Sequence, residues 1–103
     1  IIQAISGRKY YINNIEACYN LQKNIVNELE KIFSEAYKDD KGIIKNSAFP
    51  NGDSYKNDIS FYFENDAMVH TACYDFSIKD TNTRDRLSIA IFTKQYLEWF
   101  WSL

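Results

Sequence analysis

The sequence predicts an α+β fold in which one long N-terminal helix and a short C-terminal helix pack on one face of an antiparallel sheet of three or four strands. Residues 13–38 repeat apolar side chains at three- and four-residue steps, the period of an amphipathic helix. Residues 58–92 hold three stretches of alternating, strand-favouring side chains. With 103 residues, 46% of them apolar, the chain is predicted to be one domain, 1–103.

The long helix is expected over residues 13–38. Asn13 is suited to cap its N-terminus, with Glu16 three residues later as in a capping box. The polar segment 38–41, followed by Gly42, is expected to end the helix. A short strand is expected before it, over residues 1–6. The apolar stripe comprises Ile15, Cys18, Leu21, Ile25, Leu29, Ile32, Phe33 and Ala36.

Three strands are expected over residues 58–64, 67–77 and 86–92, after a long loop over 45–58 that contains a Pro-Asn-Gly turn signal. A tight two-residue turn at Asn65 and Asp66 is expected to join the first two strands as a hairpin. Residues 78–85 form a looser loop before the third strand. Residues 93–103 are expected to form the C-terminal helix, with Thr93 as its cap.

The expected hairpin places Phe61 opposite His70, on an apolar sheet face that the helices cover. His70, the sole histidine, is therefore expected to be a packed, internally hydrogen-bonded residue. Cys73 is expected on the opposite, polar face, so that the sheet separates it from Cys18 of the helix. Both cysteines are predicted to stay reduced and unbonded.

The polar face offers no convergent catalytic set. With His70 on the other face, Cys73 lacks a base, and the carboxylates Asp75 and Glu64 lie on different strands. One histidine and two separated cysteines form no metal-ligand spacing, and the three glycines form no phosphate loop. We therefore expect no catalytic residues, no metal and no cofactor. An enzyme that uses Asp75, Tyr62 and Arg86 is the least favoured alternative.

Charge and hydropathy narrow the range of partners and locations. The net charge of −2 supplies no positive field for nucleic acid. The chain lacks an apolar run of the ~20 residues that a membrane span needs, and residues 1–11 do not resemble a signal peptide. These features predict a cytoplasmic protein that contacts neither nucleic acid nor membrane. Because the chain begins with Ile1 instead of methionine, the alternative is a protein whose export signal has been removed.

Residues 57–101 resemble small bacterial immunity proteins, in particular those encoded beside contact-dependent growth-inhibition toxins. The resemblance lies in the strand end CYDFS at 73–77 and the strand-to-helix segment RLSIAIFTKQYLEW at 86–99. It implies a non-enzymatic cytoplasmic protein that binds a cognate toxin domain, expected to be a nuclease, and occludes it. No binding residues carry over from this family. The alternative is a small-ligand-binding or regulatory α+β domain.

A candidate partner anchor is Trp99, which is expected beside the apolar stripe of the C-terminal helix. The alternative is that Trp99 closes the rim of the core, as large aromatics at domain edges often do. Exposed aromatics ringed by polar groups are typical of interface hot spots, so Trp99→Ala is predicted to weaken partner binding by ~2 kcal/mol or more. If Trp99 is not the anchor, the loop that contains Phe49 is the next candidate. Acidic and aromatic residues expected to join the surface are Glu64, Asp66, Tyr62, Asp75, Asp53 and Tyr55.

Overall fold

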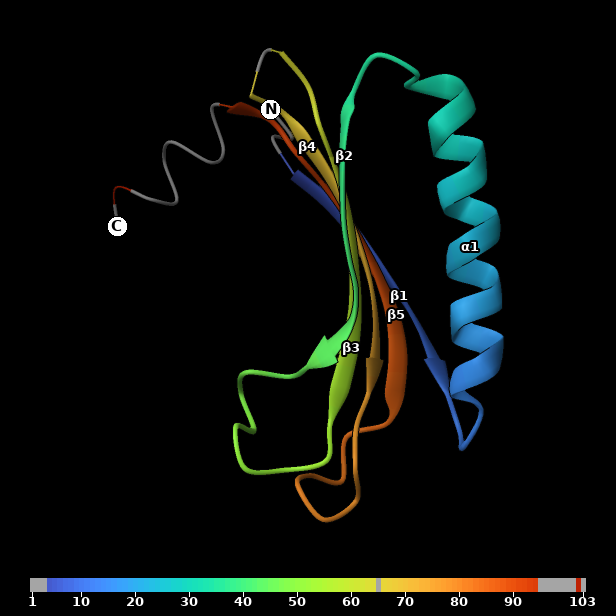
Figure 1. The fold of residues 1–103 in the computed structure, drawn as a ribbon, viewed down its shortest axis with the longest axis vertical. Coiled ribbons are helices and arrows are strands. Elements are labelled where there is room, and N and C mark those ends of the chain that lie inside the picture. The colour runs from blue at the N-terminus through green and yellow to red at the C-terminus, as the bar shows by residue number, and fades with distance from the viewer. Residues whose placement is uncertain (1–3, 65, 95–101, 103) are drawn as a thin grey trace.

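A computed structural model describes residues 4–64, 66–94 and 102. In these residues one helix lies along one face of a five-stranded antiparallel sheet with strand order β1-β5-β4-β3-β2 (Figure 1). The elements are β1 (Ala4–Tyr11), α1 (Ile15–Ile32), β2 (Tyr37–Lys45), β3 (Tyr55–Tyr62), β4 (Met68–Asp75) and β5 (Asp85–Phe92). The predicted sheet of three or four strands with two helices is wrong. The segment expected to form the C-terminal helix, 93–103, lies mostly outside the described residues.

The amphipathic helix is confirmed, but it is shorter than expected. Its cap is Asn14, whose side chain accepts a hydrogen bond from the backbone N of Ala17 at 3.3 Å. Asn13, the expected cap, has a positive φ of 51° one residue earlier. The helix ends at Ile32, and the chain reverses direction into β2.

Strand β2 was not predicted, because its sequence YKDDKGIIK is rich in charge and lacks a clear alternation. It lies at the edge of the sheet, where charged residues discourage pairing with other chains. Gly42, expected to terminate the helix, instead lies within this strand at φ 68°, where the register with β3 shifts. Its backbone N donates to the Asp40 carboxylate at 2.9 Å.

The connection between β3 and β4 is longer than the predicted two-residue turn. Tyr62 pairs with Met68, and the backbone N of Phe63 donates to the carbonyl of Ala67 at 3.0 Å. Phe61 therefore pairs with Val69 instead of His70. A one-residue shift turns every side chain of a strand to the other face. The predicted orientation of β4 is thus wrong.

With β4 turned over, Val69, Thr71 and Cys73 face α1 and are buried. Cys18 and Cys73 are both fully buried and form a disulfide, with Cα atoms 6.0 Å apart. The prediction that these cysteines stay reduced and unbonded is therefore wrong. That prediction assumed that the sheet separates Cys18 from Cys73, which the observed orientation of β4 contradicts.

Gln22 of α1 lies between two apolar clusters of the core and is 1% exposed. Its Nε2 donates to the Asn57 carbonyl at 2.9 Å and to the Thr71 hydroxyl at 3.0 Å. Its Oε1 accepts from Asn57 Nδ2 at 3.0 Å. A buried amide keeps its place only when it is hydrogen-bonded, so these contacts fix the position of α1 on β3 and β4.

Among the described residues, no helix is long and apolar enough to cross a membrane.

Candidate partner-binding surface

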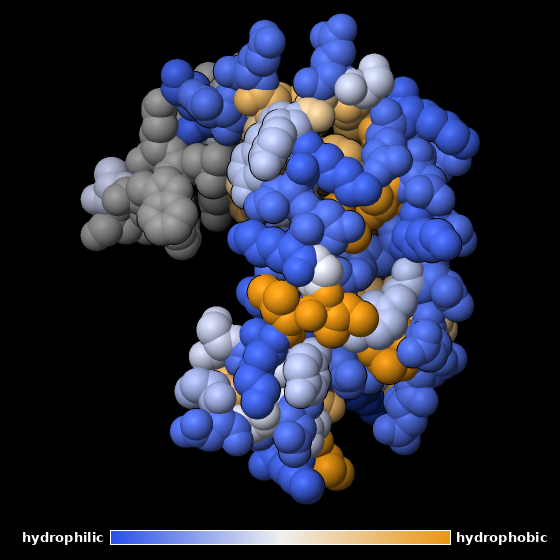
Figure 2. Space-filling model, in the orientation of Figure 1, coloured by the Kyte–Doolittle hydropathy of each residue, from blue (hydrophilic) through white to orange (hydrophobic). Residues whose placement is uncertain are grey.

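The sheet surface opposite α1, on which the described residues place no helix, is here called the helix-free face and carries clustered polar and aromatic groups. Two loops, 46–54 and 76–84, stand out beyond this face at one end of the sheet (Figures 1 and 2). The strand registers align its side chains in rows across the sheet. Side chains of this face are Arg8, Tyr10, Lys56, Asp58, Ser60, Tyr62, His70, Tyr74, Arg86 and Ser88.

One end of the helix-free face holds a compact group of aromatic rings around Arg86. The Arg86 guanidinium carbon lies 4.8 Å from the centre of the Tyr74 ring and 5.4 Å from that of Phe76. These two rings stack with centres 5.8 Å apart, and Phe49 meets Phe76 edge-on at 6.3 Å. Arg86 Nε also donates to Ser88 Oγ at 3.3 Å. We call Phe49, Tyr74, Phe76 and Arg86 the aromatic–arginine cluster.

Hydrogen bonds between loops hold this cluster in place. The Asp80 carboxylate accepts from the backbone N of Asp53 at 3.0 Å and from Ser54 Oγ at 2.6 Å. Ser54 Oγ in turn accepts from the backbone N of Ser77 at 2.9 Å. Gly52 permits this approach, because a Cβ there would lie 2.1 Å from Asp80. The loop that carries Phe49 is thereby fixed against the loop that follows Phe76.

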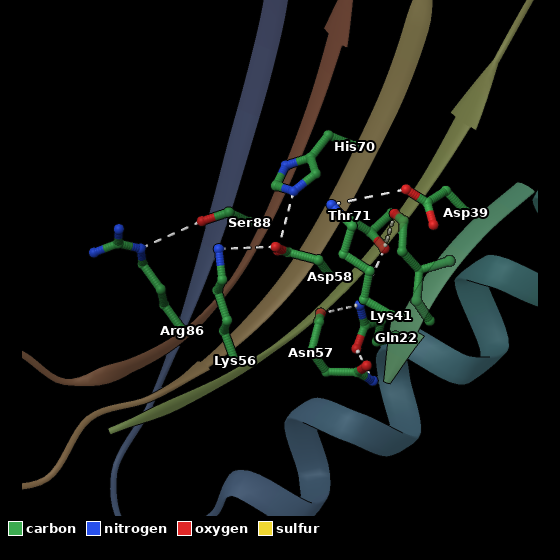
Figure 3. A network of polar contacts seen from close by, with 11 residues as sticks. Gln22, Asp39, Lys41, Lys56, Asn57, Asp58, His70, Thr71, Arg86 and Ser88 are labelled. Carbon is green, nitrogen blue, oxygen red and sulfur yellow. Dashed lines mark hydrogen bonds and ion pairs between the residues drawn. The ribbon is translucent and has the colours of Figure 1, made fainter. Parts of the chain in front are cut away.

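The centre of the helix-free face contains a charged group (Figure 3). Asp58 accepts from Lys56 at 2.9 Å and contacts His70 Nε2 at 3.2 Å. The hydrogen bond from His70, followed by that from Lys56, outweighs the effect of burial and lowers the pKa of Asp58 from 3.8 to about 2. His70 thus has an internal partner, but the prediction that it faces the helix-covered core is wrong.

Among the described residues, no hydroxyl or thiol is hydrogen-bonded to this charged group. Ser60 lies directly opposite His70 in the register, yet no hydrogen bond joins the two side chains, and Ser60 is buried. Both cysteines are in the disulfide. The arrangement of Lys56, Asp58 and His70 places one carboxylate within hydrogen-bond distance of an ammonium group and an imidazole nitrogen.

The predicted partner-binding residues lie in two separate places. Tyr62, Glu64 and Asp66 are near the β3–β4 connection, with Asp66 3.8 Å from Lys94. At the other end lie Tyr55, Asp53 and Asp75, with Asp53 3.7 Å from Lys79. Tyr62 lies seven positions after Tyr55 along β3, a distance of roughly 23 Å. Trp99, the expected anchor, lies outside the described residues.

The enzyme alternative required Asp75, Tyr62 and Arg86 on one face, and the structure does not bring them together. Asp75 lies on the α1 side, next to a pocket of about 350 Å³ near the helix N-terminus. Tyr62 and Arg86 do share the helix-free face, but Tyr62 pairs with Met68, whereas Arg86 pairs with Tyr74 six residues along β4.

The pocket beside Asp75 is a second candidate site. Asp85 also lines it, and burial, followed by the charge of Asp85, raises the pKa of Asp75. Burial and then the charge of Asp75 also raise the pKa of Tyr19. A neutral or cationic small molecule is the ligand that two such carboxylates would favour. No three metal-ligating side chains cluster within the part of the chain that the structure describes.

Tyr74, Phe76 and Lys56 were not predicted to lie on the partner-binding surface, whereas Arg86 was predicted on the polar face and the loop of Phe49 as the second candidate anchor. Tyr74 and Phe76 alternate with Asp75 in CYDFS, so the correct strand orientation would have placed Tyr74 with Arg86. The alternation in the sequence was therefore informative, but the assumed two-residue turn assigned Tyr74 and Phe76 to the face that α1 covers.

Comparisons with known proteins give no match to a family model, to a curated protein or to a solved structure.

Proposed function

We propose that this chain is a non-enzymatic protein that binds a partner protein through its helix-free face and that it acts as a toxin-neutralising immunity protein. The aromatic–arginine cluster carries the first part of this proposal. Tyr and Arg are over-represented among the residues that dominate binding energy, and rigid rings lose little entropy when a partner covers them. The likeness of residues 57–101 to immunity proteins supports the second part.

The surface has the layout of an interface. Phe49, Tyr74, Phe76 and Arg86 are all partly exposed, so that a partner would bury area that solvent now reaches. Tyr10 follows Arg86 in the same row and is 51% exposed. Polar and charged groups surround the rings, as in the rim of a protein interface.

The Cys18–Cys73 disulfide bears on where the protein acts. Disulfides persist in oxidising compartments and are rare in the reducing cytoplasm. In place of the expected cytoplasmic location, we propose that the protein acts where this bond is maintained. The toxin that it neutralises would then act outside the reducing cytoplasm, which disfavours the intracellular nuclease that the resemblance suggested.

Co-expression tests the proposal. Cells that produce the toxin domain encoded beside this gene should survive when this chain is exported with it, and the two purified proteins should form a stable complex. Export of a Tyr74→Ala, Arg86→Ala double variant should restore killing. An adjacent gene without toxicity, or protection by the double variant equal to that by the native chain, would refute the proposal.

The small-ligand alternative is favoured by one observation, the pocket that Asp75 and Asp85 line. Screening a set of small amines and polyols by thermal shift would test it. A ligand that raises the melting temperature of the native chain, but not that of an Asp75→Asn variant, would support this alternative.

A further inference from the structure

Arg86 on the helix-free face is held by three neighbouring side chains. Tyr74 and Phe76 hold its guanidinium by stacking and cation–π contact, and Ser88 holds its Nε. Arginine held in this way loses little further entropy on binding, and its planar fork matches a carboxylate with two parallel hydrogen bonds. Within the described residues, no hydrogen bond or ion pair engages its two terminal amino groups.

No carboxylate within residues 4–64, 66–94 and 102 pairs with Arg86 or with Arg8. Arg8 lies one row from Arg86, opposite Ser88. Asp58, which shares a row of the face with Ser88 and Arg8, is already paired with Lys56 and His70. This part of a chain whose net charge is −2 therefore carries local positive charge without an acidic partner.

We propose that Arg86 binds a carboxylate side chain from an acidic segment of the partner protein, with Arg8 adding charge beside it and Tyr74 and Tyr10 flanking the contact. This inference rests on the proposed function and names the chemistry of the partner. The exposed edges of the rings would contact the apolar part of the same segment. Charge complementarity of this kind sets the register and the association rate of an interface.

The test titrates the toxin domain encoded beside the gene against the native full chain and four variants of it. Arg86→Ala should weaken the affinity roughly 30-fold or more, because it leaves a carboxylate of the partner buried and unpaired. Arg86→Lys keeps the charge and should still lose most of this affinity, because an ammonium lacks the planar fork. Ser88→Ala should weaken binding less than Arg86→Ala does, because it removes only the hydrogen bond that positions the Arg86 guanidinium.

Lys31→Ala is the matched control, since it removes one positive charge from the exposed side of α1, where Lys31 pairs with Glu28. It should bind as tightly as the native chain. Thermal melts of all forms distinguish lost binding from lost folding. If Arg86→Ala and Lys31→Ala both bind like the native chain, the inference is wrong while the proposed function stands.

A second arm does not need the toxin domain. Sodium acetate, added to the isotopically labelled chain, should shift the Arg86 side-chain Nε–H resonance more than an equal concentration of sodium chloride does. Arg8→Ala should reduce the shift. A response to inorganic phosphate but not to acetate would overturn the inference in favour of a phosphate-bearing ligand. If acetate shifts the Arg86 resonance while the toxin domain does not bind, the proposed function is wrong, but Arg86 is still a carboxylate-binding site.

Discussion

Cys18 in the first turns of α1 is bonded to Cys73 in the middle strand of the sheet, although 55 positions separate them in the sequence. Strand β4 has β5 and β3 as its neighbours, so the bond ties the helix to the centre of the sheet. It closes a loop that contains most of α1, β2 and β3.

Removal of this disulfide should destabilise the fold substantially. A loop of this length gives an expected loss of about 2–5 kcal/mol in the free energy of unfolding for Cys18→Ala, Cys73→Ala. Chemical denaturation of the native chain, with and without reductant, measures it. The reduced native chain should unfold at a denaturant concentration close to that of the double variant. Titratable thiols in unfolded, unreduced native protein would contradict the bond.

Gln22→Ala should destabilise the chain by about 2–3 kcal/mol, because it leaves the amide of Asn57 and the hydroxyl of Thr71 buried with fewer partners. Urea unfolding provides the measurement. Asn24→Ala, on the exposed side of the same helix, is the control and should change stability by less than about 0.5 kcal/mol. Equal effects of the two substitutions would show that the buried amide does not fix the helix.

Gly52→Ala should cost about 1–3 kcal/mol, because its Cβ would displace the Asp80 carboxylate from Asp53 and Ser54. A double-mutant cycle with Asp80→Ala tests this cause. The cost of Gly52→Ala should shrink when Asp80 is already alanine, since neighbouring residues are not additive. If the two substitutions lower the free energy of unfolding additively, Gly52 does not contribute to stability by leaving room for Asp80.

The stability contributed by Asp58 should depend on pH in the acid range. Its pKa is depressed in the folded state from 3.8 to about 2, so the charged form stabilises the fold above the unfolded pKa. That contribution is lost as the pH falls from about 4 toward 2. The difference in stability between the native chain and Asp58→Asn should therefore narrow over this range. A difference that stays constant down to pH of about 2 would show that Lys56 and His70 do not depress this pKa.

The long helix could be predicted because its apolar side chains repeat with a single period over four turns or more, and only its two ends were misplaced. The orientation of β4 could not be predicted from the sequence. Its two sides, Val69 with Thr71 and His70 with Ala72, are both of mixed polarity, so turn length alone decided the register. The one extra residue in the connection between Phe63 and Ala67 has no distinctive sequence signal.

The candidate surface was only partly predictable for the same reason. The alternation of β5 correctly predicted Arg86 on the helix-free face. The wrong orientation of β4 placed Tyr74 on the opposite face, although Tyr74 pairs with Arg86. The contact of Phe49 with Phe76 joins two loops that are distant in the sequence, and Asp80 fixes them through tertiary hydrogen bonds. Local sequence patterns do not encode such a contact.

The most direct test of partner binding through the helix-free face is an NMR footprint. The isotopically labelled chain would be titrated with the toxin domain encoded beside the gene. Signals of Lys56, Tyr74, Phe76 and Arg86 should shift or broaden, while those of Lys31, on the exposed side of α1, should not. Changes confined to α1, or to the pocket that Asp75 and Asp85 line, would contradict the proposed surface.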